Sequence, residues 1–224
     1  MTATRPTDDR LPEDRAPGVG ALDDRALDDD GAALRALHDR LVAQARAHGL
    51  LDVAYRVVDS PVGPLLVAAG ESGVLRVAFE VQDHDAALAD LAARVSPRVL
   101  HGGDRLDPVL RELDEYFAGR RRTFDVPVDL RLARGYRRDV AAALAAVPYG
   151  STASYAQVAA VTGRPAAVRA VGTACALNPV PLLLPCHRVV RSDGTAGRYA
   201  GGDAAKRLLL DLERQGLAPA PAQA

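Results

Sequence analysis

The sequence has few cysteines: its 224 residues include only Cys175 and Cys186. Two cysteines cannot form the disulfide framework of a small secreted protein. The sequence also has no apolar run long enough to cross a membrane, and its acidic N-terminus has no signal-peptide apolar segment. These absences predict a soluble protein of a reducing compartment, located in the cytoplasm and without a membrane partner.

Ligand sets for metals and cofactors are also missing from the sequence. The five histidines are scattered and show no zinc-ligand spacing; they are His38, His48, His84, His101 and His187. The glycine-rich segment 194–202 lacks the Gly-Lys-Ser/Thr ending of a phosphate-binding loop, and there is no dinucleotide fingerprint. The sequence therefore predicts neither a metal site nor a cofactor.

Charge is nearly balanced in total, with a formal net charge of −1, but it is unevenly distributed. The first thirty residues are rich in aspartate, whereas the half after Arg120 is rich in arginine and carries few acids. This distribution predicts a basic face suited to phosphate groups. A solvated arginine-rich surface without a partner is the alternative.

The N-terminal 50 residues divide into two segments. Residues 1–30 show no apolar periodicity and are predicted to be a disordered tail. Residues 31–48 are predicted to form an amphipathic helix that ends at Gly49. Its apolar residues at helical spacing are Leu34, Leu37, Leu41 and Ala45. This helix either packs on the main body or binds a partner.

The region from 53 to 130 contains short strands followed by helices. The predicted strands are 53–58, 65–69 and 74–81. Tight turns between them indicate an antiparallel meander. The segments predicted next are a helix at 83–94, a short β segment at 98–101 and a helix at 107–118. Residues 124–130 are predicted to be an extended edge segment, because Pro127 cannot donate a hydrogen bond.

The second half contains four predicted helices, which span 136–147, 154–161, 166–177 and about 203–214. Ser154 and Gln157 have capping-box spacing, and Gly163 lies in the tight turn that follows. Helix, tight turn and helix form a helix-turn-helix arrangement. The terminal helix is predicted to bury Leu208, Leu209 and Leu212, and the tail after Gly216 is predicted to be disordered.

Helix 166–177 consists mostly of small residues, with Arg169 as its long polar side chain. It has few side chains able to read base edges, which argues against a sequence-specific repressor. Small side chains let a helix backbone approach a groove closely, so that Arg169 could enter the base stack. An alanine-rich core helix with one exposed arginine is the alternative.

Cys186 lies beside His187 in an apolar run bracketed by prolines, Asn178-Pro179-Val180-Pro181-Leu182-Leu183-Leu184-Pro185-Cys186-His187-Arg188-Val189-Val190. A thiol is a weak nucleophile until it loses its proton, and a nearby imidazole favours the thiolate. The prolines favour a rigid loop over a helix or a central strand. The run therefore predicts a preformed loop with an activated sulfur. A buried, inert cysteine with a chance histidine neighbour is the alternative.

The combination of Asn178-Pro179-Val180-Pro181 with Pro185-Cys186-His187-Arg188-Val189 resembles the active-site signature of the O6-alkylguanine-DNA alkyltransferases. The resemblance extends over about residues 52–216. It implies an α/β (α+β) fold, with a ribonuclease H-like N-terminal domain containing a small antiparallel sheet and a mostly helical C-terminal domain of winged-helix or helix-turn-helix type. The implied domains are 51–133 and 134–216, between an N-terminal segment 1–50 and a tail 217–224.

The resemblance implies the roles of five catalytic residues. Cys186 is the alkyl acceptor, His187 ionises it through a water molecule, and Glu213 orients His187. Asn178 supports the active-site turn, and Tyr155 donates a proton to the departing guanine. From the residues alone, Glu213 is an ordinary surface acid and Tyr155 is a half-buried residue at a helix start.

The resemblance also implies two sets of binding residues. The DNA-binding set, in which Arg169 fills the space left by a flipped base, is Arg169, Ala167, Ala170, Gly172 and Thr173. The set that shapes the substrate pocket is Pro181, Val189, Tyr199, Ala200 and Gly201. Some members carry a serine in place of Ala200. Cys175 matches a non-catalytic position.

Two departures from the family pattern concern packing. Members usually begin the first helix of the second domain with a Thr-Pro-Phe type sequence and carry a Trp on it. Here Arg134-Gly135-Tyr136 and Ala141 stand instead. Both changes bear on local structure more than on chemistry.

The implied function is repair of double-stranded DNA by irreversible, single-turnover transfer of an alkyl group from O6-alkylguanine to Cys186, by a monomer. Activity on O4-alkylthymine is left open. The main alternative is a non-enzymatic lesion sensor, although such alkyltransferase-like proteins carry Trp where Cys186 stands. Further alternatives are a transcription regulator that responds to its own alkylation and a thiol hydrolase. The sequence has neither an extra DNA-binding module for the first nor a specific sign of an oxyanion hole for the second.

Overall fold

The computed structural model describes residues 24–217. The chain divides after His38 into two compact units, residues 1–38 and 39–224. Helix α1, Asp24–Ala47, begins before residue 31, so the prediction of a disordered tail is wrong for residues 24–30. Aspartates are favourable in the first turns of a helix, at its positive end. The predicted tails at 1–23 and 218–224 lie outside the described residues.

The apolar residues of α1 differ in exposure. Leu34, Leu37 and Leu41 are all exposed. In the part that begins at Asp39, Val42 is buried and joins Leu51 in the core. Within residues 39–47, Val42 and not Leu41 therefore meets the core.

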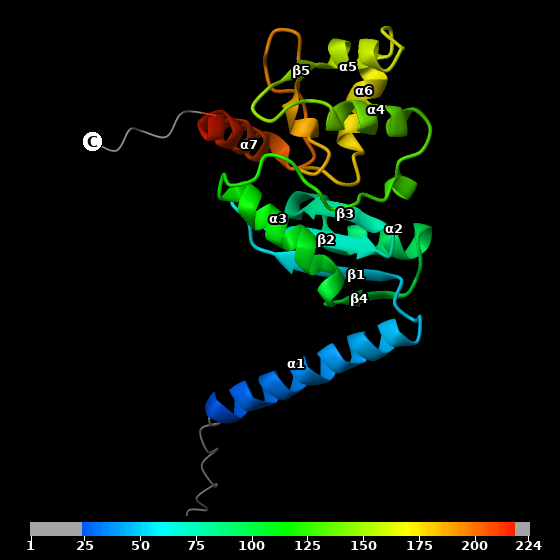
Figure 1. The fold of residues 1–224 in the computed structure, drawn as a ribbon, viewed down its shortest axis with the longest axis vertical. Coiled ribbons are helices and arrows are strands. Elements are labelled where there is room, and N and C mark those ends of the chain that lie inside the picture. The colour runs from blue at the N-terminus through cyan, green and yellow to red at the C-terminus, as the bar shows by residue number, and fades with distance from the viewer. Residues whose placement is uncertain (1–23, 218–224) are drawn as a thin grey trace, which may run out of the picture. The chain divides into compact units, whose positions relative to one another are not determined.

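Residues 53–101 contain a four-stranded sheet (Figure 1). Its strands are β1 Val53–Val58, β2 Leu65–Gly70, β3 Gly73–Phe79 and β4 Val99–His101, in the order β3-β2-β1-β4. The antiparallel pairing of β1, β2 and β3 confirms the predicted meander. β4 pairs parallel with β1, because helix α2 (His84–Arg94) makes the crossover between β3 and β4. Gly73, with a φ of 133°, allows the β2–β3 turn to lie against Pro127.

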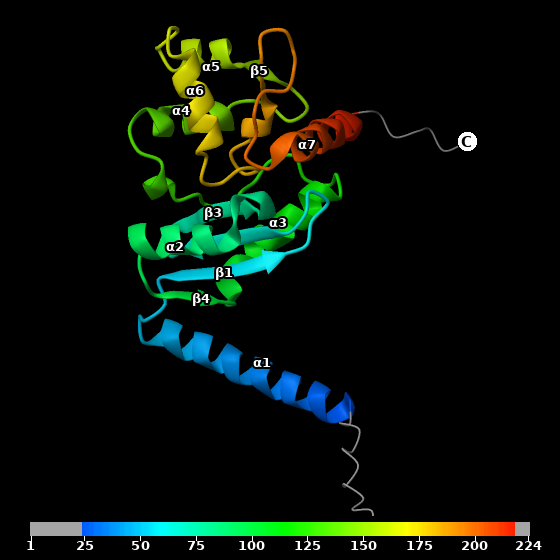
Figure 2. The ribbon, with the colours of Figure 1, turned by 180° about the vertical axis from the view of Figure 1, so that it is seen from behind.

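Both faces of the sheet are buried, and alternate residues along each strand serve opposite faces. On one face, Leu66 belongs to the same apolar cluster as Leu91 of α2. On the other, Leu65 and Val67 belong to the cluster that contains Tyr116 of helix α3 (Asp107–Phe117). Figure 1 shows α3 in front of the sheet, and Figure 2, seen from behind, shows α2 in front. α3 therefore lies on the face that also takes part in the core of the second half.

The segment 124–130 lies at the edge of the sheet, as predicted, but it forms no regular strand. It runs beside β3 and makes one isolated bridge, between Val74 and Val128. The Val74 N–H donates to the Pro127 carbonyl at 2.8 Å, and the Asp129 N–H donates to the Val74 carbonyl at 2.9 Å. Pro127 has no N–H to continue the ladder, so pairing stops there.

The second half consists of helices and a two-stranded parallel sheet. Its elements are α4 Tyr136–Ala145, β5 Ala153–Ser154, α5 Tyr155–Val161, α6 Val168–Ala176, β6 Val189–Val190 and α7 Gly202–Leu217. The capping box predicted for α5 is present, because Ser154 Oγ accepts from the Gln157 N–H and Gln157 Oε1 accepts from the Ser154 N–H. α5, the turn after it and α6 follow one another in the predicted helix-turn-helix order, at the top of Figure 1.

The buried side of α7 also differs in part from the predicted one. Leu209 is fully buried and Leu212 is half-buried, but Leu208 is exposed. Positions 206, 209 and 213 follow the helical period, so Lys206 and Glu213 share the buried side with Leu209. Two buried charged side chains thus stand where the sequence alone predicts a purely apolar contact.

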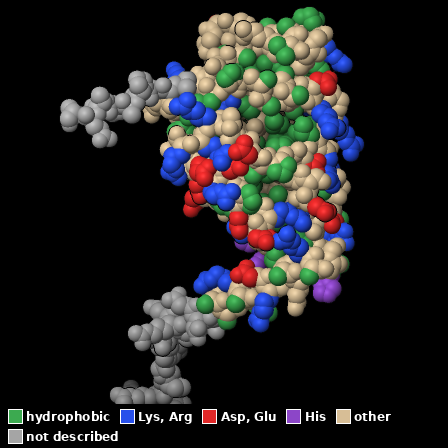
Figure 3. All heavy atoms as spheres, in the orientation of Figure 1, with side chains coloured by type: hydrophobic (Ala, Val, Ile, Leu, Met, Phe, Trp, Pro, Cys, Tyr) green, Lys and Arg blue, Asp and Glu red, His purple; other side chains and the backbone are tan. Residues whose placement is uncertain are grey.

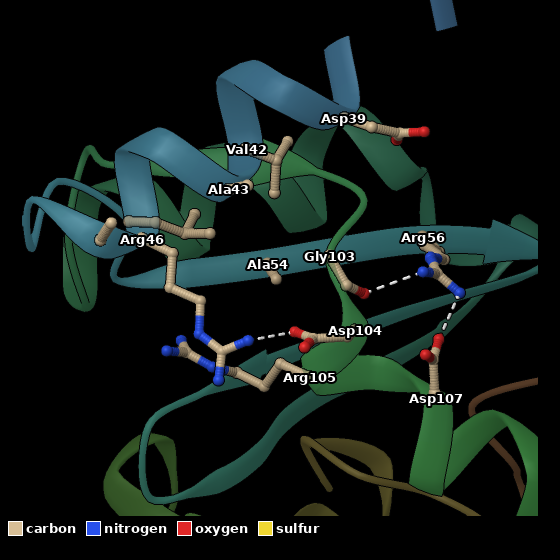
Figure 4. A pocket seen from close by; sticks show the side chains of 12 residues that line it. Asp39, Val42, Ala43, Arg46, Ala54, Arg56, Gly103, Asp104, Arg105 and Asp107 are labelled. Carbon is tan, nitrogen blue, oxygen red and sulfur yellow. Dashed lines mark hydrogen bonds and ion pairs between the residues drawn. The ribbon is translucent and has the colours of Figure 1, made fainter. Parts of the chain in front are cut away.

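A cavity of about 740 Å³ lies between the last turns of α1 and the sheet (Figure 4). Val42 is one of its apolar lining residues. Its rim carries two ion pairs, Arg46 with Asp104 and Arg56 with Asp107. None of the residues that line it belongs to the segment 178–190, the cysteine loop, which carries Cys186. The cavity and the predicted chemistry are therefore separate features of the molecule.

Candidate active site

The loop that carries Cys186 is buried along its length. Residues 178–190 are all buried, and Cys186 is 1% exposed. Cys186 begins a single 3-10 turn, Cys186–Arg188, directly after Pro185. Leu182 holds a φ of 76°, a left-handed conformation that a leucine adopts only where surrounding contacts fix it. The structure therefore has the preformed loop that the prolines predict.

Asn178 fixes this loop and contacts the sulfur. Its Nδ2 donates to the Leu184 carbonyl at 2.8 Å and to Cys186 Sγ at 3.2 Å. Its Oδ1 accepts from the Val180 N–H at 3.1 Å. A hydrogen bond donated to sulfur favours the thiolate over the thiol. One side chain thus supports the turn and stabilises negative charge on Cys186.

His187 and Glu213 form a fully buried pair. His187 Nε2 lies 2.8 Å from Glu213 Oε1, and the two side chains are 0% and 1% exposed. An ionised carboxylate only accepts hydrogen bonds, so Nε2 carries a proton and Nδ1 of a neutral ring has a lone pair. Nδ1 has no hydrogen-bond partner among the described residues. Nδ1 is therefore the nitrogen at which His187 can accept a proton.

Glu213 is held as a carboxylate by several donors. Tyr116 Oη donates to Oε1 at 2.8 Å, and the Gly150 N–H donates to Oε2 at 2.9 Å. Arg188 donates from Nη2 to Oε1 at 2.9 Å and from Nε to Oε2 at 3.0 Å. Burial alone would raise the pKa of Glu213, but the hydrogen bonds from His187 and Arg188 lower it to about 2.

Burial also sets the resting protonation of Cys186 and His187. Burial raises the pKa of Cys186 to about 11, against the opposing effects of the Asn178 hydrogen bond and the Lys206 charge. Burial lowers the pKa of His187, against the opposing effect of Glu213. The resting site therefore holds a thiol beside a neutral imidazole. Its sulfur becomes a nucleophile only when a base removes its proton.

Tyr155 begins α5 and lies close to the glycine-rich loop. A Cβ on Gly197 would come within 2.7 Å of Tyr155 Cε2, so the phenol ring occupies space that any other residue at 197 would fill. Burial raises the pKa of Tyr155, and the charges of Cys175 and Cys186 raise it further. The hydroxyl is therefore protonated at neutral pH and able to donate.

The predicted pocket residues lie around the same loop. Pro181, Val189 and Tyr199 are buried, and Ala200 and Gly201 are half-buried. The Tyr199 ring meets the His187 ring edge to face, with 6.1 Å between centroids. A Cβ on Gly201 would come within 2.7 Å of Phe79. The end of β3 therefore supports the glycine-rich loop from the first half of the chain.

The predicted DNA-binding residues lie on the outer side of α6. Arg169, Ala170 and Thr173 are exposed, and Ala167 and Gly172 are half-buried. Figure 3 shows few charged side chains over the upper part of the visible face, where α5 and α6 lie in Figure 1. Residues 134–216 as a whole nevertheless contain eleven Lys and Arg residues against five Asp and Glu residues. This half of the chain therefore carries an excess of positive charge.

Two models of one protein family match the chain. The ribonuclease-like domain of 6-O-methylguanine DNA methyltransferase matches residues 53–130, and the DNA-binding domain matches residues 135–215. The chain belongs to this family of alkyltransferases. The family that the cysteine motif resembles is thereby confirmed.

Individual alkyltransferases agree with this assignment. The methylated-DNA–protein-cysteine methyltransferase of Mycolicibacterium paratuberculosis is 39% identical over 163 residues, which are 73% of this chain and 93% of the relative. A crystal structure of the Mycobacterium tuberculosis O6-methylguanine methyltransferase matches with a TM-score of 0.64 and 35% identity, over 76% of this chain and 96% of the other. A structure of the M. tuberculosis protein in complex with DNA matches with a TM-score of 0.62 and 33% identity, over 73% and 94%. These likenesses confirm the predicted fold class.

Three residues of this alkyltransferase site were not among the predicted ones: Tyr116, Arg188 and Lys206. Lys206 is fully buried, and its Nζ donates to the Val189 carbonyl at 2.6 Å and to the Gly197 carbonyl at 3.2 Å. It thereby ties β6 to the glycine-rich loop. Its signal in the sequence is its place seven residues before Glu213, on the same helix face.

Neither a metal centre nor a membrane segment is present in the described part of this alkyltransferase. Its residues 24–217 contain no group of three or more His, Cys, Asp or Glu side chains that could hold a metal ion. Over the same residues, no helix is both long enough and apolar enough to cross a membrane. Cys175 and Cys186 are both free and buried.

Glu213→Gln is expected to destabilise the protein by about 3 kcal/mol at pH 7. The amide group of Gln would face Arg188 or the Gly150 N–H, which are donors and would lose their acceptor. Because the folded-state pKa of Glu213 is about 2, below its ordinary value of 4.5, its carboxylate contributes stability that is present above pH 4.5 and is lost as pH falls toward 2. The destabilisation is therefore expected to be smaller at pH 3 than at pH 7.

Denaturant unfolding at pH 7 and pH 3 measures this difference. Asp211→Asn, an exposed change on the same helix, is the control and is expected to alter the free energy of unfolding by less than about 0.5 kcal/mol. A Glu213→Gln effect of the same size at both pH values would contradict the ionised state of the buried carboxylate.

Proposed function

We propose that this alkyltransferase repairs double-stranded DNA by transferring an alkyl group from O6 of guanine to Cys186. The observation that carries the proposal is a buried sulfur in contact with Asn178, beside a His187–Glu213 pair whose Nδ1 is open to a proton. The thioether formed on Cys186 does not revert to a free thiol, so each molecule acts once. The damaged base is the alkyl donor and the sulfur is the acceptor, so the reaction needs no cofactor.

Thiolate formation proceeds through His187. A water molecule relays the proton from Cys186 Sγ to His187 Nδ1, the nitrogen left open by the hydrogen bond to Glu213. The imidazolium that results is stabilised by the Glu213 carboxylate. Asn178 donates to the sulfur and stabilises the thiolate.

Alkyl transfer is a displacement at the alkyl carbon. The thiolate attacks this carbon, a bond forms between sulfur and carbon, and the bond between carbon and O6 breaks. Guanine departs with the electron pair and takes a proton from the hydroxyl of Tyr155. Burial raises the pKa of Tyr155, so the hydroxyl carries its proton at neutral pH when the base arrives. The proton on His187 then restores the neutral phenol through solvent.

The base is extruded from the duplex before it reacts. Cys186 is 1% exposed, so its sulfur cannot reach a stacked base. The small outer face of α6 lies in the minor groove, where Ala167, Ala170, Gly172 and Thr173 allow close approach. Arg169 fills the space that the base leaves. Arginines of the basic second half bind phosphates, so affinity falls as salt rises.

The extruded guanine occupies the space beside the cysteine loop. Backbone groups of Cys186 and Val189 hold its edge, although the Val189 carbonyl already accepts from Lys206 and has one lone pair to spare. Pro181, Tyr199 and the Ala200-Gly201 segment shape the walls. Ala200 offers no hydroxyl to O6, so backbone groups alone serve there.

The two halves act as two domains of a monomer. Residues 51–133 form the supporting ribonuclease H-like domain, and residues 134–216 form the domain that binds DNA and reacts. Support comes from β3, where the Val77 N–H donates to the Pro179 carbonyl at 2.8 Å and Phe79 meets Tyr199 with 5.4 Å between centroids.

Intact and peptide mass measured after incubation with excess duplex oligonucleotide containing O6-methylguanine tests the proposal. The expected result is a gain of one methylene, saturating at one per chain and located on the Cys186 peptide. An unmodified protein that still binds the lesion would overturn the proposal in favour of a lesion sensor. Modification of Cys175 instead would overturn the choice of nucleophile.

A further inference from the structure

Three tyrosine side chains with buried hydroxyls lie near Glu213, and one of them touches it. Tyr116 Oη donates to Glu213 Oε1 at 2.8 Å. The hydroxyls of Tyr149 and Tyr199 are buried without a hydrogen-bond partner among the described residues. Tyr116 lies on α3, 97 residues before Glu213. Its hydroxyl therefore brings a donor from the first half of the chain to the carboxylate that orients His187.

The ring of Tyr116 is held so that its hydroxyl has one direction. The residue is 0% exposed. Its ring packs on Phe117 and Phe124, each with 5.4 Å between centroids, and on Tyr149 at 6.2 Å. Burial and the charge of Glu213 raise the pKa of Tyr116, so the hydroxyl stays protonated and acts as a donor. A tyrosine hydroxyl has one proton to donate, and Glu213 accepts the proton of Tyr116.

The hydrogen bond falls on the oxygen that faces His187. Oε1 accepts from His187 Nε2 and from Tyr116 Oη, both at 2.8 Å, and from Arg188 Nη2 at 2.9 Å. Oε2 accepts from Arg188 Nε and from the Gly150 N–H. Tyr116 is thus a neutral donor that shares Oε1 with the histidine. It limits both the rotation of the carboxylate and the negative charge that His187 meets.

We propose that Tyr116 is a positioning residue of the transfer reaction, which acts on Cys186 through the Glu213 carboxylate and His187. This inference rests on the proposed function. It assigns to the first half of the chain a direct part in the proton relay, beyond support of the loop. Loss of the hydroxyl leaves Oε1 less restrained and more negative.

The charged and titratable groups around the relay are few, and all are fixed. Those that face Glu213 are His187, Arg188, Tyr116, Tyr149 and Tyr199. Those that face His187 are Glu213, Arg188, Lys206 and Tyr199. Only removal of the Tyr116 hydroxyl changes the donors to Oε1 while it leaves every charge in place.

Tyr116→Phe is the test, and Tyr149→Phe is its matched control. Both variants lose a buried hydroxyl and keep the ring, but the Tyr149 hydroxyl has no hydrogen-bond partner within residues 24–217. Single-turnover methyl transfer at saturating protein is expected to slow about tenfold in Tyr116→Phe and to be unchanged in Tyr149→Phe. Binding of the lesion duplex is expected to stay the same in both.

The pH profile separates positioning from packing. The acid limb of the profile of transfer rate against pH reports protonation of the His187–Glu213 pair. With one donor fewer on Oε1, imidazolium is held more strongly, so the acid limb of Tyr116→Phe is expected to move to higher pH by about half a unit. Tyr149→Phe is expected to keep the limb of the parent protein. A Tyr116→Phe profile and rate equal to those of the parent would overturn the proposal.

A double-mutant cycle with Glu213→Gln locates the effect. If Tyr116 acts through Glu213, Tyr116→Phe is expected to slow transfer little further in the Glu213→Gln background. An unchanged tenfold loss in that background would also overturn the proposal. Failure of the proposed function can be told apart from failure of the positioning role of Tyr116. A parent protein that transfers no methyl group contradicts the proposed function. A parent protein and a Tyr149→Phe variant that both transfer normally leave the positioning role to be decided by Tyr116→Phe.

Discussion

Cys186→Ser is expected to reduce methyl transfer by more than about a thousandfold while DNA binding is retained. A serine hydroxyl keeps the size and the contact with Asn178, but it ionises far less readily than a thiol and is a poorer nucleophile. In this site the thiol proton of Cys186 is removed through neutral His187, whose Nδ1 has no hydrogen-bond partner among the described residues. The measurement is single-turnover transfer from labelled O6-methylguanine duplex, together with duplex binding.

Cys175→Ser is the matched control for this result. Cys175 is also a free, buried thiol, and its pKa is raised by burial and by the neighbouring Cys186. It lies on the buried side of α6 and has no histidine relay, so its replacement is expected to leave transfer at the level of the parent protein. Appreciable transfer by Cys186→Ser would contradict the assignment of the nucleophile.

The cysteine loop was predictable from sequence because its determinants are local. Prolines restrict the backbone directly, and Asn178 reaches Cys186 across eight residues. The meander and the α5 capping box depend likewise on short-range patterns, and both are present. In each case the residues that make the structure are close together in the chain.

The rest of the site depends on distant contacts, which periodicity does not report. Tyr116 meets Glu213 across 97 residues, and nothing in its local sequence marks it. Lys206 could have been found, because it shares the helix face of Leu209 and Glu213. A buried lysine contradicts the usual preference for exposure, so the apolar stripe of leucines was the simpler interpretation, and it fails at Leu208.

Residues 124–130 lie at the edge of the sheet, as Pro127 predicts, but they make a single bridge and no strand. Extended sequence indicates a strand, but a strand also needs a partner with which it can exchange hydrogen bonds. Pro127 accepts one bond from Val74 and cannot return one. The segment therefore stays extended beside β3 without becoming a strand of the sheet.

Arg169→Ala is expected to slow repair of duplex DNA by about a hundredfold, but to change the reaction with free O6-benzylguanine by less than about threefold. The free base needs no extrusion, so it reports the chemistry of Cys186 alone. A base in a duplex must leave the stack, at a cost of a few kcal/mol that a side chain in the vacated space offsets. Arg169 is the long polar side chain on the exposed side of α6. Single-turnover rates at saturating protein measure both substrates.

Arg164→Ala and Arg169→Lys separate stack filling from charge. Arg164 lies in the turn before α6, is exposed and stacks over the Tyr136 ring at 4.8 Å. Its removal deletes the same charge, so duplex binding is expected to weaken and to depend less on salt, while the rate of the bound duplex is unchanged. Arg169→Lys keeps the charge without the planar guanidinium and is expected to fall between the parent protein and Arg169→Ala. Equal losses of Arg169→Ala on duplex and free base would place Arg169 in the chemistry or the fold, and would remove the argument for base extrusion.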